Sequence, residues 1–197
     1  MTQASQTLRE ITGMGFEYAS LKDSALILVD CQNTYRRGVM QLTNVEPAIL
    51  EAQKLLTIAR DLKVPVIHIQ HDAGVGTPYD ITADIGAISA EVAPENGELV
   101  VIKNYPNAFW HTNLEAQLKA LGIENIVLAG FMTHMCINST ARGAFNLGFK
   151  PTIVASACAT RSLTSANGKI IDAQTMHESA LAAVRDLFAV VVDDVNS

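Results

Sequence analysis

Short runs of consecutive apolar residues alternate along this chain with longer segments in which apolar residues recur at helical spacing. The runs predict buried strands at residues 24–30, 64–70, 99–102, 125–130, 151–155 and 188–192. The helical spacing begins at Leu55, Leu56, Ala59 and Leu62 and predicts further helices at about 112–122, 134–147 and 172–187. Strands that alternate with helices predict an α/β fold, in which helices cover both faces of a parallel sheet.

Two stretches fall outside this alternation. Residues 1–22 are polar and mixed, so we expect an N-terminal arm followed by one domain over residues 23–197. The apolar residues of the arm have no evident place in such a core, and we expect them to pack on a neighbouring subunit: Leu8, Ile11, Met14, Phe16 and Tyr18. Residues 71–98 are rich in Gly and Pro, and we expect this long loop to cover a substrate.

Composition and charge narrow the class of protein. The chain has 197 residues, of which 49% are hydrophobic and 17% charged, as in an ordinary globular domain. Its net charge is −6 and its basic residues are scattered, so we expect no nucleic-acid partner. No apolar run reaches the roughly 18 residues of a membrane span, so we expect no membrane partner. The cysteines, Cys31, Cys136 and Cys158, are odd in number and far apart, which indicates reduced thiols in a cytoplasmic protein.

Candidate chemistry lies just beyond the ends of three predicted strands. Asp30, Lys103 and Cys136 each follow an apolar run, and in an open parallel sheet such positions meet in one crevice. Cys136 also falls in the first turn of a predicted helix, where free N–H groups favour thiolate, so we expect a lowered thiol pKa. An acid, a cation and a thiol together predict a nucleophilic site. The alternative is that three unrelated residues happen to follow strands.

Three segments carry a resemblance to a known family. Residues 29–35, residues 101–103 with 107–109, and residues 130–136 resemble the motifs of the isochorismatase-like cysteine hydrolases, in the same order and spacing. That superfamily includes nicotinamidases, N-carbamoylsarcosine amidases and streptothricin hydrolases. The resemblance implies a three-layer α/β/α sandwich whose six-stranded parallel sheet has the order 3-2-1-4-5-6. It also implies a homodimer or homotetramer.

The same resemblance assigns roles to residues of this chain. It implies that Asp30, Lys103 and Cys136 are the catalytic residues. It further implies a cis peptide bond between Phe131 and Met132, and an oxyanion hole formed by the backbone N–H groups of Met132 and Cys136.

Departures from the family narrow the expected reaction. Nicotinamidases carry a metal-binding Asp-x-His with a further His after the second strand. This chain has only His71 and Asp72 at the corresponding place. We expect His68 to be a buried residue of the strand itself. We therefore expect no metal and no cofactor, and nicotinamide is disfavoured. Isochorismatases that cleave a vinyl ether generally lack the nucleophilic cysteine, so Cys136 argues against that reaction.

The substrate-binding candidates are aromatic or polar residues close to the three motifs: Asn33, Tyr35, Phe109, Trp110 and His134. For the aromatic residues the alternative is a place in the core, and for the polar residues it is local turn chemistry. Arginines 36, 37 and 161 are read as solvated charges, unless one near the mouth of the site meets a carboxylate.

These observations predict a metal-independent cysteine hydrolase that cleaves a C–N bond through a thioester acyl-enzyme. The expected substrate is a compact, largely neutral small molecule with an amide, lactam or carbamoyl group. One alternative is isochorismate-type hydrolysis driven by Asp30, with Cys136 a bystander. The other is a non-catalytic binding protein on the same fold.

Overall fold

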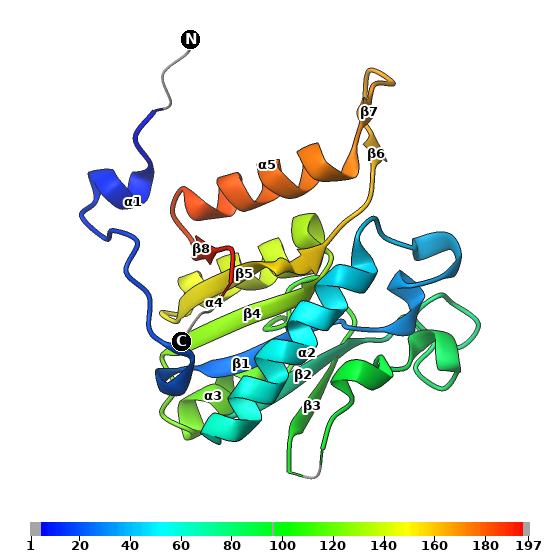
Figure 1. The fold of residues 1–197 in the computed structure, drawn as a ribbon, viewed down its shortest axis with the longest axis horizontal. Helices are drawn as coiled ribbons and strands as arrows, with labels where there is room; N and C mark the ends of the chain where they lie inside the picture. The colour runs from blue at the N-terminus through cyan, green and yellow to red at the C-terminus, as the bar shows by residue number, and fades with distance from the viewer. Residues whose placement is uncertain (1–4, 96, 195–197) are drawn as a thin grey trace.

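A six-stranded parallel sheet forms the centre of the molecule, in a computed structural model that describes residues 5–95 and 97–194 (Figure 1). The strand order is β3-β2-β1-β4-β5-β8, so the predicted order is confirmed, with β8 as the sixth strand of the sheet. The strands are β1 (Ala25–Val29), β2 (Val66–His71), β3 (Leu99–Lys103), β4 (Asn125–Phe131), β5 (Lys150–Ala159) and β8 (Val190–Val192).

Helices cover both faces of the sheet and create two cores. Helix α2 (Val45–Leu62) packs on one face, and α3 (Leu114–Ala120), α4 (Asn138–Asn146) and α5 (Ala173–Arg185) pack on the other. Successive side chains of a strand point to opposite faces, so the fully buried strand β1 serves both cores. Leu26 and Leu28 join the α2 side, whereas Ile27 and Val29 join the other side.

Two local features differ from the sequence prediction. The helix expected from residue 112 begins at Leu114, because the Thr112 hydroxyl donates to the Ala108 carbonyl and accepts the Leu114 N–H. A small antiparallel hairpin, β6 (Leu163–Thr164) and β7 (Ile170–Ile171), follows the sheet strand β5. Its strands are too short to produce an apolar pattern, and in Figure 1 it projects from the body beyond the start of α5.

The described part of the N-terminal arm packs on the end of α5 in the same chain. In its short helix α1 (Leu8–Ile11), the Leu8 N–H donates to the Asp186 carboxylate and the Arg9 guanidinium donates to the Leu187 carbonyl. Arg185 lies over the Phe16 ring, 3.8 Å from its centroid. Leu8, Ile11, Met14 and Tyr18 remain exposed, so packing on a neighbouring subunit stays a prediction. Residues 1–4 lie outside the described residues.

A close approach between β1 and β4 fixes the edge of the sheet where the site forms. Gly130 pairs with Val29, and a Cβ atom at Gly130 would lie 2.1 Å from the Val29 carbonyl oxygen. Its φ of 120° is also one that residues with a Cβ rarely adopt. Glycine therefore lets the two strand ends meet, and this brings Asp30 next to the turn that carries Cys136.

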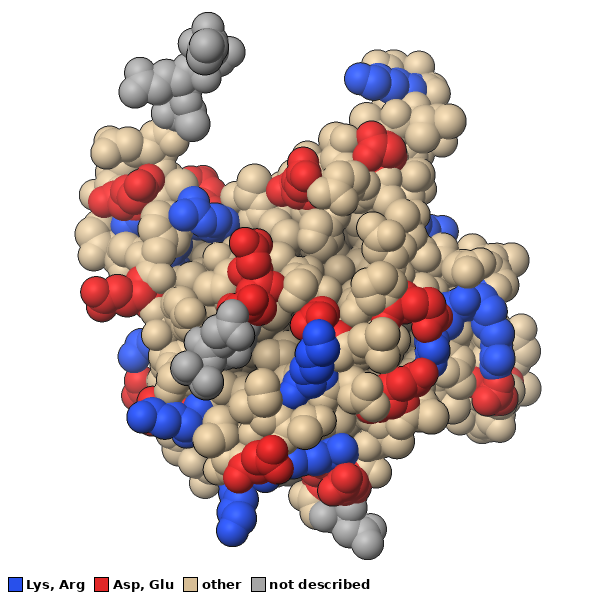
Figure 2. Space-filling view, viewed as in Figure 1, with Lys and Arg blue, Asp and Glu red and all other residues tan. Residues whose placement is uncertain are grey.

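The surface gives no strong electrostatic preference on the face seen in Figure 2, where acidic and basic side chains are interspersed. None of the helices in the described part of the chain combines the length and hydropathy needed to span a bilayer.

Candidate active site

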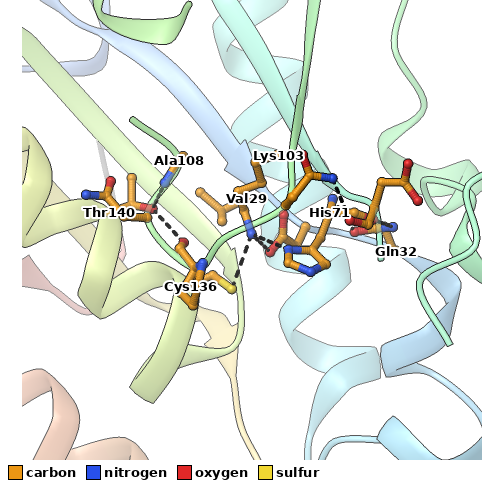
Figure 3. A network of polar contacts seen from close by, with 12 residues as sticks. Val29, Gln32, His71, Lys103, Ala108, Cys136 and Thr140 are labelled. Atoms are coloured by element: carbon orange, nitrogen blue, oxygen red, sulfur yellow. Dashed lines mark hydrogen bonds and ion pairs between the residues drawn. The ribbon is translucent and has the colours of Figure 1, made fainter. Parts of the chain in front are cut away.

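Asp30, Lys103 and Cys136 meet at the carboxyl edge of the sheet, as predicted. The Lys103 ammonium lies 2.7 Å from Asp30 Oδ2, and both side chains are 0% exposed. The same Nζ donates to the Cys136 sulfur at 3.4 Å, and Figure 3 shows Lys103 between Cys136 and His71. An acid, a cation and a thiol thus share one buried point, although their catalytic roles stay predictions.

Cys136 lies on a distorted helical turn between β4 and α4. The peptide bond between Phe131 and Met132 is cis, as the family resemblance implied. The turn that follows, Thr133–Ile137, is π-helical, and the Met132 carbonyl accepts the N–H groups of Met135 and Ile137. Thr133 Oγ1 lies 2.9 Å from His177 Nδ1 of α5, which ties the turn to that helix. The oxyanion hole of Met132 and Cys136 N–H groups stays a prediction.

Burial dominates the protonation of the site. It raises the pKa of Cys136, and the negative charge of Asp30 raises it further, while Lys103 opposes both. The expectation of a lowered Cys136 pKa was therefore wrong, because the sequence pattern does not show how deeply the thiol is buried. Burial also raises the pKa of Asp30, against the influence of Lys103. The thiol keeps its proton at rest, next to a carboxylate that is a stronger base than an exposed one.

His71 is a third partner of the Lys103 ammonium that the sequence analysis did not anticipate. Its Nδ1 lies 3.0 Å from Lys103 Nζ, and the two residues face each other in the register of β2 and β3. Burial and the Lys103 charge lower the pKa of His71 to about 4, so the ring is neutral at pH 7. Since Nδ1 faces an ammonium donor, the imidazole proton is on Nε2.

Gln32 fixes the backbone of His71. Its amide oxygen accepts the His71 N–H at 2.9 Å, and its amide nitrogen donates to the His71 carbonyl at 2.9 Å and the Gly86 carbonyl at 2.7 Å. The side chain is completely buried. Gln32 therefore joins the strand end to the loop after it, a role for which the sequence offers no signal beyond its position near Asp30.

The predicted strand residue His68 is buried, as expected, and binds the Glu98 carboxylate at 2.9 Å. Among the described residues, no three His, Cys, Asp or Glu side chains gather as a metal site requires. The Nδ1 lone pair of His71 is directed at the Lys103 ammonium. The expectation that the enzyme uses no metal stays a prediction.

The predicted substrate-binding residues are divided between the site and its surroundings. Tyr35 is buried near Asp30 and packs edge-on against Phe131 and Tyr79. His134, two residues before Cys136, forms a hydrogen bond between its Nδ1 and the Thr160 hydroxyl. The Asn33 side-chain amide binds the loop after β2, since its nitrogen donates to the Asp84 carbonyl and its oxygen accepts the Ser89 hydroxyl.

The two substrate-binding candidates after β3, Phe109 and Trp110, lie outside the cluster of Asp30, Lys103 and Cys136. Phe109 is buried and stacks on Phe149 at 5.5 Å, in the core beneath α4. Trp110 is 56% exposed and lies edge-on to His111. A substrate role for either residue stays a prediction.

The loop after β2 lies over the site and contributes Tyr79. The Tyr79 ring packs edge-on against His71 at 4.8 Å and against Tyr35 at 5.8 Å. Residues farther along the loop pair with the segment after β1. Gln32 and Ile88 form an isolated β-bridge, and the Ser89 N–H donates to the Cys31 carbonyl. Cys136 itself is only 4% exposed in this arrangement.

One of the three predicted surface arginines differs from the others. Arg36 binds Glu46 and Glu91, and Arg37 binds Asp84. Arg161 follows β5 at the same edge as the site, and its Nε is buried without a hydrogen-bond partner among the described residues. Burial lowers the pKa of His134 and the Arg161 charge lowers it further, so the guanidinium lies near the turn that carries Cys136.

Residues 24–194 match the isochorismatase domain family, which covers nearly all of the described chain. This chain belongs to the isochorismatase family. The isochorismatase-family protein YddQ of Bacillus subtilis (strain 168) is 36% identical over 171 residues, which cover 85% of this chain and 94% of that protein. The fold is thus that of an isochorismatase-family hydrolase.

Two further relatives extend the similarity over almost the whole length. The secreted isochorismatase effector Isc1 of Verticillium dahliae is 31% identical over 193 residues, 96% of this chain and 99% of that protein. The crystal structure of an isochorismatase from Pseudomonas putida KT2440 superposes with a TM-score of 0.93 at 33% identity, covering 96% of this chain and 97% of that chain.

The raised Cys136 pKa leads to a prediction for Asp30→Asn. Removing the carboxylate charge leaves the Lys103 ammonium to act on the thiol, so the Cys136 pKa should fall and alkylation by iodoacetamide at pH 7 should accelerate about tenfold or more. Turnover should nevertheless be lost, because the base is gone. Peptide mapping after limited labelling measures the rate at each cysteine.

The buried Cys158 is the control, since its labelling rises only if the fold opens. Slower Cys136 alkylation in Asp30→Asn, with Cys158 unchanged, would contradict this account of the site.

Proposed function

We propose that this protein is a cysteine amidohydrolase that cleaves a C–N bond of a small molecule without a metal. The observation that carries the proposal is the contact of one buried ammonium, Lys103, with both Asp30 and Cys136. A thiol beside a carboxylate and a thiolate beside a carboxylic acid have the same net charge next to that ammonium. The proton can therefore move from sulfur to oxygen without creating a net charge in a dry site, which would be costly.

The reaction follows from this arrangement. Asp30 takes the thiol proton as the Cys136 sulfur attacks the amide or carbamoyl carbon, and backbone N–H groups of Met132 and Cys136 stabilise the oxyanion. The C–N bond breaks, and Asp30 gives its proton to the leaving nitrogen. Water then attacks the thioester while Asp30 accepts a water proton. The C–S bond breaks, and the proton returns to the sulfur.

The names of two relatives support amide chemistry. The ureidoacrylate amidohydrolase RutB of Stutzerimonas stutzeri is 29% identical over 171 residues, 68% of this chain and 69% of that protein. The maleamate amidohydrolase of Pseudomonas putida is 31% identical over 147 residues, 66% of this chain and 69% of that protein. Both names denote a substrate that is a carboxylate anion.

We extend the proposal to a substrate that carries one carboxylate. Arg161 supports this, because its buried Nε has no hydrogen-bond partner within residues 5–95 and 97–194, while Arg36 and Arg37 bind acidic side chains. A guanidinium binds a carboxylate through paired N–H donors, which suits recognition of an anion beside the reacting amide. This differs from the largely neutral substrate expected from the sequence, because the state of Arg161 is visible only in the fold.

The cellular location belongs to the proposal as well. The sequence analysis predicted a cytoplasmic protein, whereas the relative Isc1 is named as a secreted effector. We retain the cytoplasmic assignment on the three unpaired, buried cysteines.

An acyl-enzyme on Cys136 would test the reaction. Purified protein is mixed with a panel of amides, lactams and carbamoyl compounds, quenched in acid and examined by intact mass and peptide mapping. We expect a mass increase equal to the acyl group on the Cys136 peptide. Cys136→Ala should show no adduct and should lose about a thousandfold or more in kcat.

Turnover that persists in Cys136→Ala would instead support isochorismate-type hydrolysis through Asp30. A wild-type protein that binds panel members but turns none over would support the non-catalytic alternative. Either result overturns the proposal.

A matched pair of substrates tests the role of Arg161. We expect a half-amide of a dicarboxylic acid, such as maleamate, to have a kcat/KM about tenfold or more above that of its methyl ester, from one charge-assisted contact. Arg161→Met should remove this preference, and Arg161→Lys should retain part of it. A preference unchanged by Arg161→Met would refute the assignment.

A further inference from the structure

The Lys103 ammonium carries three N–H donors, and three possible acceptor atoms of other residues surround it. Asp30 Oδ2 lies at 2.7 Å, His71 Nδ1 at 3.0 Å and the Cys136 sulfur at 3.4 Å. An ammonium offers three donors and no acceptor, so its donors equal these three neighbouring groups in number. The Lys103 side chain is fully buried, so water does not replace a missing partner.

We propose that His71 is a positioning residue, whose Nδ1 holds Lys103 so that the ammonium keeps one N–H on Asp30 and one on Cys136. The proposal rests on the proposed function only for its effect on turnover. Without the acceptor at Nδ1, the third donor has no partner, and the ammonium can rotate so that two donors turn toward the Asp30 carboxylate. Cys136 would then lose the N–H that stabilises its sulfur as a negative charge develops.

The surroundings of His71 are those of a fixed acceptor. Its N–H and carbonyl are both bound by the Gln32 amide, at 2.9 Å each. Its ring packs edge-on against Tyr79 at 4.8 Å. The low pKa of His71 keeps the Nδ1 lone pair free of a proton at pH 7, so that it can accept from the ammonium.

Two substitutions with the same amide group separate this role from a merely structural one. In His71→Asn the side-chain oxygen takes approximately the place of Nδ1, whereas in His71→Gln the amide reaches the place of Nε2 and leaves a methylene opposite Lys103. We expect kcat of His71→Asn within about threefold of wild type, and kcat of His71→Gln lower by about tenfold or more. KM should change by less than about threefold in both, because the lost contact acts on the developing thiolate rather than on the bound substrate.

A second readout needs no substrate. The pH profile of Cys136 alkylation should have a higher midpoint in His71→Gln than in wild type or His71→Asn, because Lys103 then stabilises the thiolate less. The charged groups that act on the Cys136 pKa, Asp30 and Lys103, stay unchanged in both variants. The titratable phenols near Cys136, Tyr35 and Tyr79, stay unchanged as well.

The outcomes distinguish the two proposals. Equal alkylation midpoints in His71→Asn and His71→Gln, or equal kcat with a change in KM alone, overturn the role of His71. A shifted midpoint in a protein that hydrolyses no amide supports the positioning role and refutes the proposed function. If His71→Gln fails to fold, His71→Leu replaces it, since leucine also offers no acceptor to Lys103.

Discussion

The site depends on one buried cation. Lys103 brings a single positive charge into a region from which water is excluded, and that charge stabilises one negative charge nearby. The carboxylate of Asp30 holds the negative charge at rest, and the sulfur of Cys136 can receive it when the proton moves. Burial raises the pKa of both Asp30 and Cys136, which disfavours the anionic form of each. The Lys103 ammonium opposes this effect for both groups, so the proton can pass from one to the other.

The fold surrounds the Lys103 ammonium by bringing the ends of β1, β2, β3 and β4 to one edge of the sheet. Lys103 and His71 are paired in the register of β3 and β2, and Gly130 allows the end of β4 to approach β1. The loop after β2 then covers the cluster with Tyr79. Asp30, Lys103 and Cys136 are therefore buried between the strand ends and this loop.

Much of this arrangement could be predicted from sequence. The continuous apolar runs located every strand of the large sheet, and the position after a run located Asp30, Lys103 and Cys136. The contacts of His71 could not be predicted, because its pairing with Lys103 depends on which strands are neighbours. The depth at which Cys136 is buried could not be predicted either, so the Cys136 pKa was expected to shift in the wrong direction. Only the fold shows that Arg36 and Arg37 bind acidic side chains while the buried Nε of Arg161 has no hydrogen-bond partner in the described part of the chain.

Neutron diffraction from a deuterium-exchanged crystal would test the central claim most directly, because it locates the protons around Lys103. The account predicts deuterium on the Cys136 sulfur, three deuterons on Lys103 Nζ directed at Asp30, His71 and Cys136, and a deuteron on His71 Nε2 but not on Nδ1. A neutral Lys103 amine, or a bare sulfur beside a protonated Asp30 in the free enzyme, would contradict it.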